Sequence, residues 1–152
     1  MIVSEILNSK YGTFPDHIIG CVETELVSDA IERMWENKVG ALVVSNDDGV
    51  AGVFSERDVL RLLMTNQDDF RSLKLSDVMT RNVIGVSPND TAESALETMR
   101  ENRIRHLTVM EGDNLVGFLS LRDLMVFKIE HAKRSAQFLK DQIAGQSDPL
   151  PM

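Results

Sequence analysis

The chain contains an internal repeat. When the 152-residue sequence is aligned with itself at an offset of 65 residues, the segment from Ile19 to Asp58 matches the segment from Ile84 to Asp123 without a gap. GVFSERD (Gly52 to Asp58) and GFLSLRD (Gly117 to Asp123) share glycine, serine, arginine and aspartate at the same positions. A repeat of this kind constrains the architecture, because each copy forms the same structural unit. The sequence therefore predicts two similar halves.

Each copy follows the same order of elements. A short apolar strand (HIIGCV, 17–22; NVIGVS, 82–87) precedes an amphipathic helix, and a hairpin with a polar turn (46–49; 111–114) precedes a second helix. The glycine within each first strand indicates that something approaches the backbone closely. One copy of about 60 residues buries little surface alone. We therefore expect an α+β fold in which two pseudo-symmetric strand-helix-strand-strand-helix repeats pack sheet to sheet.

A second echo sets the predicted boundaries. VSEIL (3–7) and LSDVM (75–79) match at an offset of 72, so the first copy carries extra residues around YGTFP (11–15). The predicted units are an N-terminal segment (1–16), a first repeat (17–70), a linker (71–77), a second repeat (78–128) and a C-terminal helix with a flexible tail (129–152).

The predicted C-terminal helix carries an apolar stripe. Apolar residues recur at spacings of three and four, as in the a and d positions of a coiled coil: Ile129, Ala132, Ala136, Leu139 and Ile143. Such a stripe usually packs against its own domain. Because this segment lies outside both repeats, we favour a role in homodimerisation. The final GQSDPLPM is typical of a disordered tail.

Composition excludes several classes of function. A net charge of -8 argues against nucleic-acid binding, which relies on Lys and Arg to neutralise phosphates. No apolar run approaches the roughly 20 residues of a membrane helix, and the N-terminus lacks the features of a secretory signal. One cysteine and three scattered histidines offer neither an intramolecular disulfide nor a metal-ligand spacing. We expect a cytoplasmic protein without a metal site.

The repeated turn has two interpretations. Ser55 with Asp58, and Ser120 with Asp123, have the spacing of a capping box at a helix start. A helix N-terminus also offers amides to an anion, and the preceding glycine would allow a ligand to approach the strand. A carboxylate there suits the two hydroxyls of a ribose, as in dinucleotide folds. Serine for phosphate and aspartate for ribose predicts a nucleoside phosphate as ligand.

These residues resemble a known family. The two copies are similar to the tandem CBS domain, or Bateman module, whose signature is a glycine, two apolar or small residues, Ser or Thr, two variable residues and Asp. The resemblance covers Val3 to about Lys128 and includes SDVMTRNVIGV and ENRIRHLTV. It implies a non-catalytic regulatory module that binds an adenine nucleotide (AMP, ADP, ATP, NAD or S-adenosylmethionine) in up to two clefts. It also implies disc-like dimers and no catalytic cofactor.

The resemblance also implies site residues. Asp58 and Asp123 would hold ribose hydroxyls, and Ser55 and Ser120 would address phosphate. Arg57 and Arg122, beside the serines, would assist them. The adenine would be wedged by the first strand and by the segment entering the hairpin, at Ile18, Ile19, Gly20, Val39, Gly40 and Ala41 in one copy and at Val83, Ile84, Gly85, Ile104, Arg105 and His106 in the other. Thr80 is a further predicted ligand-binding residue. Core packing is the ordinary role of the apolar members of this set.

The two clefts are predicted to be unequal. Arg105 and His106 of the second copy correspond to Gly40 and Ala41 of the first. Surface solvation would explain an arginine, but Arg and His are also good phosphate donors. We therefore predict that the cleft containing Asp123 binds a phosphorylated ligand more tightly than the cleft containing Asp58.

Two other functions remain open from the sequence. An enzyme acting on nucleotides is disfavoured, because the chain has no nucleophile elbow, no P-loop and no paired acidic metal ligands. A structural dimer without a ligand, or a subunit that modulates a separate enzyme, would retain the same capped helices.

Overall fold

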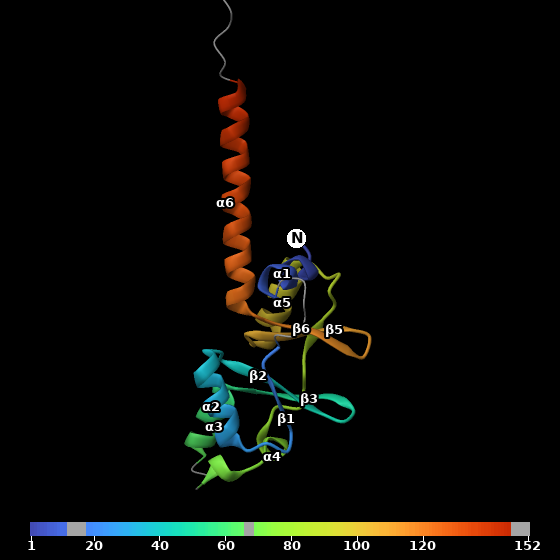
Figure 1. Cartoon of the computed structure of the whole chain (residues 1–152), viewed down its shortest axis with the longest axis vertical. Coiled ribbons are helices and arrows are strands. Elements are labelled where there is room, and N and C mark those ends of the chain that lie inside the picture. Colours follow the sequence, from blue (N-terminus) through green and yellow to red (C-terminus); the bar gives the residue numbers. More distant parts are fainter. Residues whose placement is uncertain (12–17, 66–68, 147–152) are drawn as a thin grey trace, which may run out of the picture.

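The structure is a computed structural model that describes residues 1–11, 18–65 and 69–146. Two three-stranded sheets lie one above the other, and a long C-terminal helix extends away from them (Figure 1). The first sheet pairs β1 (Gly20–Val22) in parallel with β2 (Ala41–Asn46), which pairs with β3 (Gly49–Ser55) in an antiparallel hairpin. Helix α2 (Val27–Asn37) connects β1 to β2, and α3 (Glu56–Met64) follows β3.

The second sheet repeats this arrangement. β4 (Gly85–Val86) is parallel to β5 (His106–Glu111), and β5 forms a hairpin with β6 (Asn114–Ser120). Helix α5 (Ala92–Asn102) connects β4 to β5, and α6 (Leu121–Gln146) follows β6. The register of each hairpin shifts at equivalent places, between Val44 and Ser45 and between Val109 and Met110. The predicted α+β fold with two strand-helix-strand-strand-helix repeats is confirmed.

Two details of the predicted elements differ. The first strands are shorter than 17–22 and 82–87, because only residues from Gly20 and Gly85 onward pair with the neighbouring strand. His17 lies outside the described residues. Trp35, an apolar residue of the predicted amphipathic helix, is 84% exposed, so the buried face of α2 consists of Val27, Ala30 and Met34.

The glycines of the first strands make room for protein atoms. A Cβ on Gly20 would lie 2.8 Å from the carbonyl oxygen of Val43, and one on Gly85 would lie 2.6 Å from Oγ1 of Thr108. Both contacts come from the neighbouring strand. The close approach that the sequence indicated is therefore explained by strand pairing.

The core of each repeat contains a helix from the segment that precedes the other repeat. Helix α1 (Val3–Tyr11) places Val3, Ile6 and Leu7 in the core of the second repeat. Helix α4 (Leu75–Val78), which follows the short 3-10 helix η1 (Phe70–Ser72), lies in the core of the first repeat. The echo between VSEIL and LSDVM therefore marks two equivalent helices that exchange repeats.

A third apolar cluster lies between the sheets. Ala41 and Val43 of β2 pack with Phe118 of β6, and partly buried Val53 and Leu115 lie around them. This cluster joins the repeats face to face, because β3 and β6 also contact each other. The predicted sheet-to-sheet packing is confirmed.

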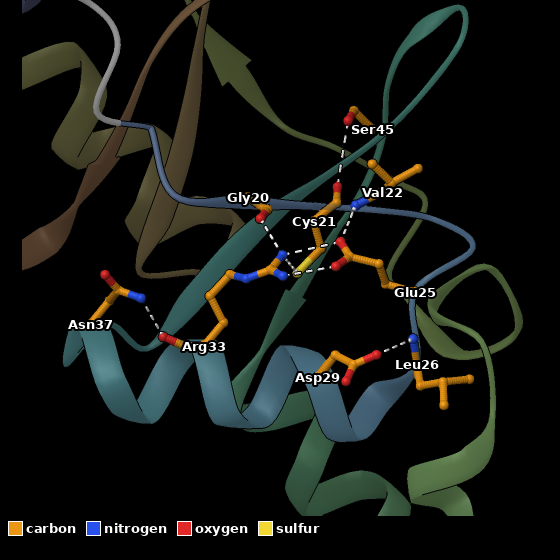
Figure 2. Close-up of polar contacts among 9 residues, drawn as sticks. All are labelled: Gly20, Cys21, Val22, Glu25, Leu26, Asp29, Arg33, Asn37 and Ser45. Atoms are coloured by element: carbon orange, nitrogen blue, oxygen red, sulfur yellow. Dashed lines mark hydrogen bonds and ion pairs between the residues drawn. The ribbon is translucent and has the colours of Figure 1, made fainter.

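A polar cluster ties β1 to α2 in the first repeat only. Nη1 of Arg33 donates to the carbonyl oxygen of Gly20 at 2.8 Å and to Sγ of Cys21 at 2.9 Å, and Nη2 donates to Glu25 at 2.8 Å (Figure 2). At the offset of 65, Val86, Asp90 and Thr98 occupy the corresponding positions of the second repeat. The two repeats thus share a backbone fold but differ in polar contacts.

Helix α6 leaves the body of the molecule after Phe127. Its first residues pack on the second repeat, where Leu124 is buried, but the side chains from 128 to 145 are all exposed. The helix continues through Gly145 and Gln146, two residues into the segment predicted to be disordered, and the remaining tail lies outside the described residues. In the ranges that the structure describes, no helix has the combination of length and apolar character that a membrane span needs.

Candidate functional site

A cleft of about 980 Å³ lies where the two repeats meet at the start of α6. One wall is formed by 38–41, between α2 and β2 of the first repeat. The other comes from the second repeat, through Arg105, His106 and the turn 120–123. The end of α1 contributes Ile6, Ser9 and Lys10. The cleft is therefore composite, because both repeats line it.

The turn from β6 into α6 forms a capping box in this cleft. The amide of Ser120 donates to Oδ2 of Asp123 at 2.8 Å, and the amide of Asp123 donates to Oγ of Ser120 at 3.1 Å. Capping occupies only one carboxylate oxygen, because Oδ1 of Asp123 accepts no hydrogen bond from any residue that the structure describes. The carboxylate can therefore cap the helix and still accept from a ligand.

The corresponding turn of the first repeat is more enclosed. Asp58 is 5% exposed, and its Oδ2 accepts from the amide of Ser55 at 2.8 Å. Its Oδ1 accepts from Oγ1 of Thr80 at 2.9 Å and forms an ion pair with Arg61 at 3.3 Å. Both oxygens of Asp58 are thus engaged by protein donors, whereas Asp123 keeps an oxygen for another partner.

The cleft carries side chains of both charges. Four cations line it (Lys10, Lys38, Arg105 and Arg122), together with three carboxylates (Glu56, Asp123 and Glu130). Cations of this kind bind phosphate oxygens, and carboxylates accept from hydroxyls. Among the residues described, no group of three or more His, Cys, Asp or Glu side chains could hold a metal ion.

His106 is a neutral, partly buried member of the cleft. Burial lowers the pKa of its imidazole, and the charges of Lys10 and Arg105 act in the same direction, whereas Asp123 opposes them. Its ring stacks on Phe118, with centroids 5.4 Å apart and planes inclined by 20°. The neutral ring offers one donor and one acceptor nitrogen beside an aromatic surface.

Comparison with known proteins assigns the chain to a family. The CBS domain matches it twice, at residues 3–65 and 75–130. The chain belongs to the CBS domain family. The family match includes α1 and α4, the two exchanged helices, as parts of the domains.

Relatives of this CBS pair cover most of its length. A mitochondrial CBS domain-containing protein of Arabidopsis thaliana, CBSX3, is 30% identical over 94% of this chain and 72% of its own. The structure of a protein with CBS domains from Burkholderia ambifaria is 29% identical, with a TM-score of 0.76 over 99% of this chain and 100% of that one. A CBS domain protein of Pyrobaculum aerophilum, solved in complex with AMP, is 28% identical, with a TM-score of 0.67 over 81% and 89% of the two chains.

The predicted site residues of the CBS pair separate into two groups. Eight of them line the cleft: Val39, Gly40, Ala41, Arg105, His106, Ser120, Arg122 and Asp123. The others lie outside it: Ile18, Ile19, Gly20, Ser55, Arg57, Asp58, Thr80, Val83, Ile84, Gly85 and Ile104. Of these, Ser55, Asp58 and Thr80 form the enclosed turn of the first repeat. Arg57 instead donates to the carbonyl oxygen of Arg103 at 3.1 Å and so links the two repeats.

The motif glycines have a structural role that the sequence interpretation missed. A Cβ on Gly52 would lie 2.7 Å from the carbonyl oxygen of Thr80 and 2.8 Å from Sδ of Met79. A Cβ on Gly117 would overlap the side chain of Leu7. The glycines therefore admit the segments of α4 and α1, and the expectation that they admit a ligand is corrected.

Several cleft residues were not predicted from the sequence. Ile6, Ser9 and Lys10 come from α1, which lies outside both repeats at the offset of 65. Lys38 and Glu56 lie beside predicted positions, and Phe118 lies within the second motif. The available signal was the match between α1 and α4 at an offset of 72, because Thr80 lies two residues after α4 and was itself predicted.

Proposed function

We propose that this CBS pair is a regulatory sensor that binds a phosphorylated adenine nucleotide in the cleft containing Asp123. The observation that carries the proposal is the composition of that cleft. An acidic acceptor with an available oxygen and four cations line one cleft together with 39–41 of the first repeat. A ribose and its phosphate need both kinds of group within a few ångströms of each other.

The solved relative from Pyrobaculum aerophilum supports the class of ligand, because it was crystallised with AMP. AMP, ADP, ATP, NAD and S-adenosylmethionine are the ligands that we would test first. No catalytic cofactor is part of the proposal. Occupation of a cleft that both repeats line would change their relative position or that of two subunits, provided that the nucleotide binds the two states with different affinity.

The contacts of the motif aspartates favour unequal clefts. Both oxygens of Asp58 accept from Ser55, Thr80 or Arg61, so a ribose would have to displace protein donors there. Asp123 keeps Oδ1 for a ligand, and Arg105 and His106 lie beside it. We infer that the Asp123 cleft is the tighter site.

Ligand binding is tested first by thermal denaturation with AMP, ATP, NAD and S-adenosylmethionine. A ligand at 100 times its Kd adds about 2.7 kcal/mol to the free energy of unfolding, which raises the Tm by several degrees in a protein of this size. Calorimetry then compares Asp58→Ala with Asp123→Ala. We expect the second variant to lose about 10- to 100-fold in affinity for AMP and the first to lose less.

Asp113→Ala is the matched control, because it removes the same charge from the exposed β5–β6 turn. Equal losses in the Asp58 and Asp123 variants would reject the inequality of the clefts. No change of Tm with any of the four compounds would reject the sensor and favour a structural dimer or a subunit that modulates an enzyme. Turnover of any of the compounds would favour an enzyme.

We also infer that the protein assembles as a homodimer through the projecting part of α6. The predicted stripe is exposed there, with Ile129 51%, Leu139 61% and Ile143 67% accessible. A cytoplasmic location remains a prediction from the sequence.

A further inference from the structure

Lys10 forms an ion pair with Asp123 inside the cleft. Its ammonium lies 2.6 Å from Oδ2 of Asp123 and 2.8 Å from the carbonyl oxygen of Phe118. The side chain is 31% exposed, so it is partly shielded by the cleft that it lines. Helix α1 is held in place by Val3 and Ile6, which are almost completely buried in the core of the second repeat. The backbone that carries Lys10 is therefore fixed, while its side chain reaches inward.

The first repeat makes the same two contacts by different means. The amide of Thr80 donates to the carbonyl oxygen of Val53 at 3.0 Å, and Oγ1 of Thr80 donates to Asp58 at 2.9 Å. At the offset of 65, Val53 corresponds to Phe118 and Asp58 to Asp123. The ammonium of Lys10 thus reaches the carbonyl and the carboxylate whose equivalents in the first repeat accept from one residue, Thr80.

In the second repeat a lysine side chain makes the contacts that Thr80 makes in the first. A ligand can therefore take the place of the lysine. Thr80 is held by its own main chain, since its carbonyl oxygen also accepts from the amide of Val53 at 2.9 Å. A lysine side chain rotates about four bonds, so its ammonium can leave Asp123 while α1 stays in place. Oδ2 of Asp123, in addition to the available Oδ1, can then accept from the two ribose hydroxyls without any movement of the backbone.

The displaced ammonium needs a new partner. An ion that leaves its partner in a partly buried place loses a favourable interaction, and the cost is recovered only if another anion is at hand. Arg105 and Arg122 line the same cleft, so a phosphate beside Lys10 would meet three cations there, in addition to the carboxylates Glu56 and Glu130 that already line it. A phosphorylated ligand supplies the anion that an unphosphorylated nucleoside lacks.

We propose that Lys10 is a specificity-determining residue, which exchanges Asp123 for the phosphate of the ligand and so makes the cleft select phosphorylated over unphosphorylated adenosine. The proposal rests on the proposed function, because it assigns the selectivity of that same cleft. In the occupied state the ribose hydroxyls donate to Asp123 and the ammonium of Lys10 donates to a phosphate oxygen.

The test compares AMP with adenosine in the wild type and in Lys10→Met, which keeps the apolar stem and removes the charge. Calorimetry on the full chain gives both dissociation constants. We expect the variant to lose about 10- to 100-fold in affinity for AMP, as for other hydrogen bonds to charged groups. Adenosine should bind the variant as well as the wild type or better, because it no longer competes with Lys10 for Asp123. Lys10→Arg should restore most of the preference for AMP.

Lys128→Met is the matched control, because it removes the same charge from an exposed position of α6 outside the cleft. Circular dichroism establishes that each variant is folded. An equal loss of affinity for both ligands in Lys10→Met, or an unchanged ratio of the two, would overturn the role of Lys10 while the sensor proposal stands. A wild type that binds neither compound would overturn both.

Discussion

Arg33 acts on the pKa of Glu25 and of Cys21 at the edge of the first sheet. Its hydrogen bonds are the main cause that holds the pKa of Glu25 below its ordinary value. For Cys21, burial is the largest effect, and it raises the pKa of the thiol to about 11. The charge of Arg33, which lies beside the thiol, lowers that pKa but does not cancel the effect of burial (Figure 2). Cys21 is 4% exposed, and with its raised pKa the thiol is protonated at neutral pH. It is therefore a structural residue of low reactivity.

The raised pKa of the Cys21 thiol predicts that the folded protein loses stability in alkaline solution. In the unfolded chain Cys21 ionises near pH 9, whereas in the folded protein it keeps its proton until about pH 11. Between these values the folded state binds more protons, so the free energy of unfolding falls as the pH rises. The fall attributable to Cys21 is on the order of 2 kcal/mol. Guanidinium denaturation of the wild type and Cys21→Ala from pH 8 to pH 11 measures it as the difference between the two curves. Parallel curves would show that the thiol does not contribute.

At the scale of secondary structure, the motif glycines fix how closely the exchanged helices pack. A Cβ on Gly52 would meet the main-chain carbonyl of Thr80, which cannot move aside easily. A Cβ on Gly117 would meet only the flexible end of Leu7. We expect Gly52→Ala to reduce the free energy of unfolding by about 1–3 kcal/mol, the usual cost of overpacking, and Gly117→Ala to cost less.

The same measurement has an internal control in α6. A Cβ on Gly145 meets no atom within 4 Å, so Gly145→Ala should leave the stability unchanged or raise it slightly, as expected for an exposed helix. Urea denaturation of the three variants gives the order. If Gly52→Ala were as stable as Gly145→Ala, the packing of Thr80 on β3 would be looser than the structure indicates.

These elements also show what the sequence could and could not predict. The repeat at 65 residues predicted the order of elements, the hairpin turns and the capping residues, because these depend on local pattern. It also predicted that Arg105 and His106 would lie with Asp123. It did not predict that α1 packs on the second repeat, since that placement depends on contacts between residues more than 80 positions apart. Lys10 was missed for this reason, and the glycines were assigned to a ligand for the same reason.

At the scale of the whole molecule, α6 is the feature that the fold itself does not explain. Helices in proteins gain most of their stability from packing of an apolar face, so an exposed apolar stripe indicates a partner. Residues 128–146 contain four Lys or Arg and two Asp or Glu, a net charge of +2 in a chain of -8. The rest of the chain therefore carries -10. Lys133 and Lys140 flank the stripe, so two copies of α6 paired along it would bring lysines together, whereas the acidic body of a second copy would attract them.

Removal of residues 133–152 tests the homodimer. The deletion leaves both repeats and the start of α6 intact, because the described side chains from 128 onward are exposed and contribute nothing to the core. We expect the full chain to sediment at twice its mass of 17.0 kDa and the shortened chain at its monomer mass in analytical ultracentrifugation. Leu139→Glu with Ile143→Glu is a second variant that keeps the length of the helix and removes only its apolar character. Salt provides a further criterion, because an interface between a basic helix and an acidic body weakens as ionic strength rises, whereas a purely apolar one does not. A shortened chain that remains a dimer would assign the assembly to another surface and leave the stripe of α6 to a different protein.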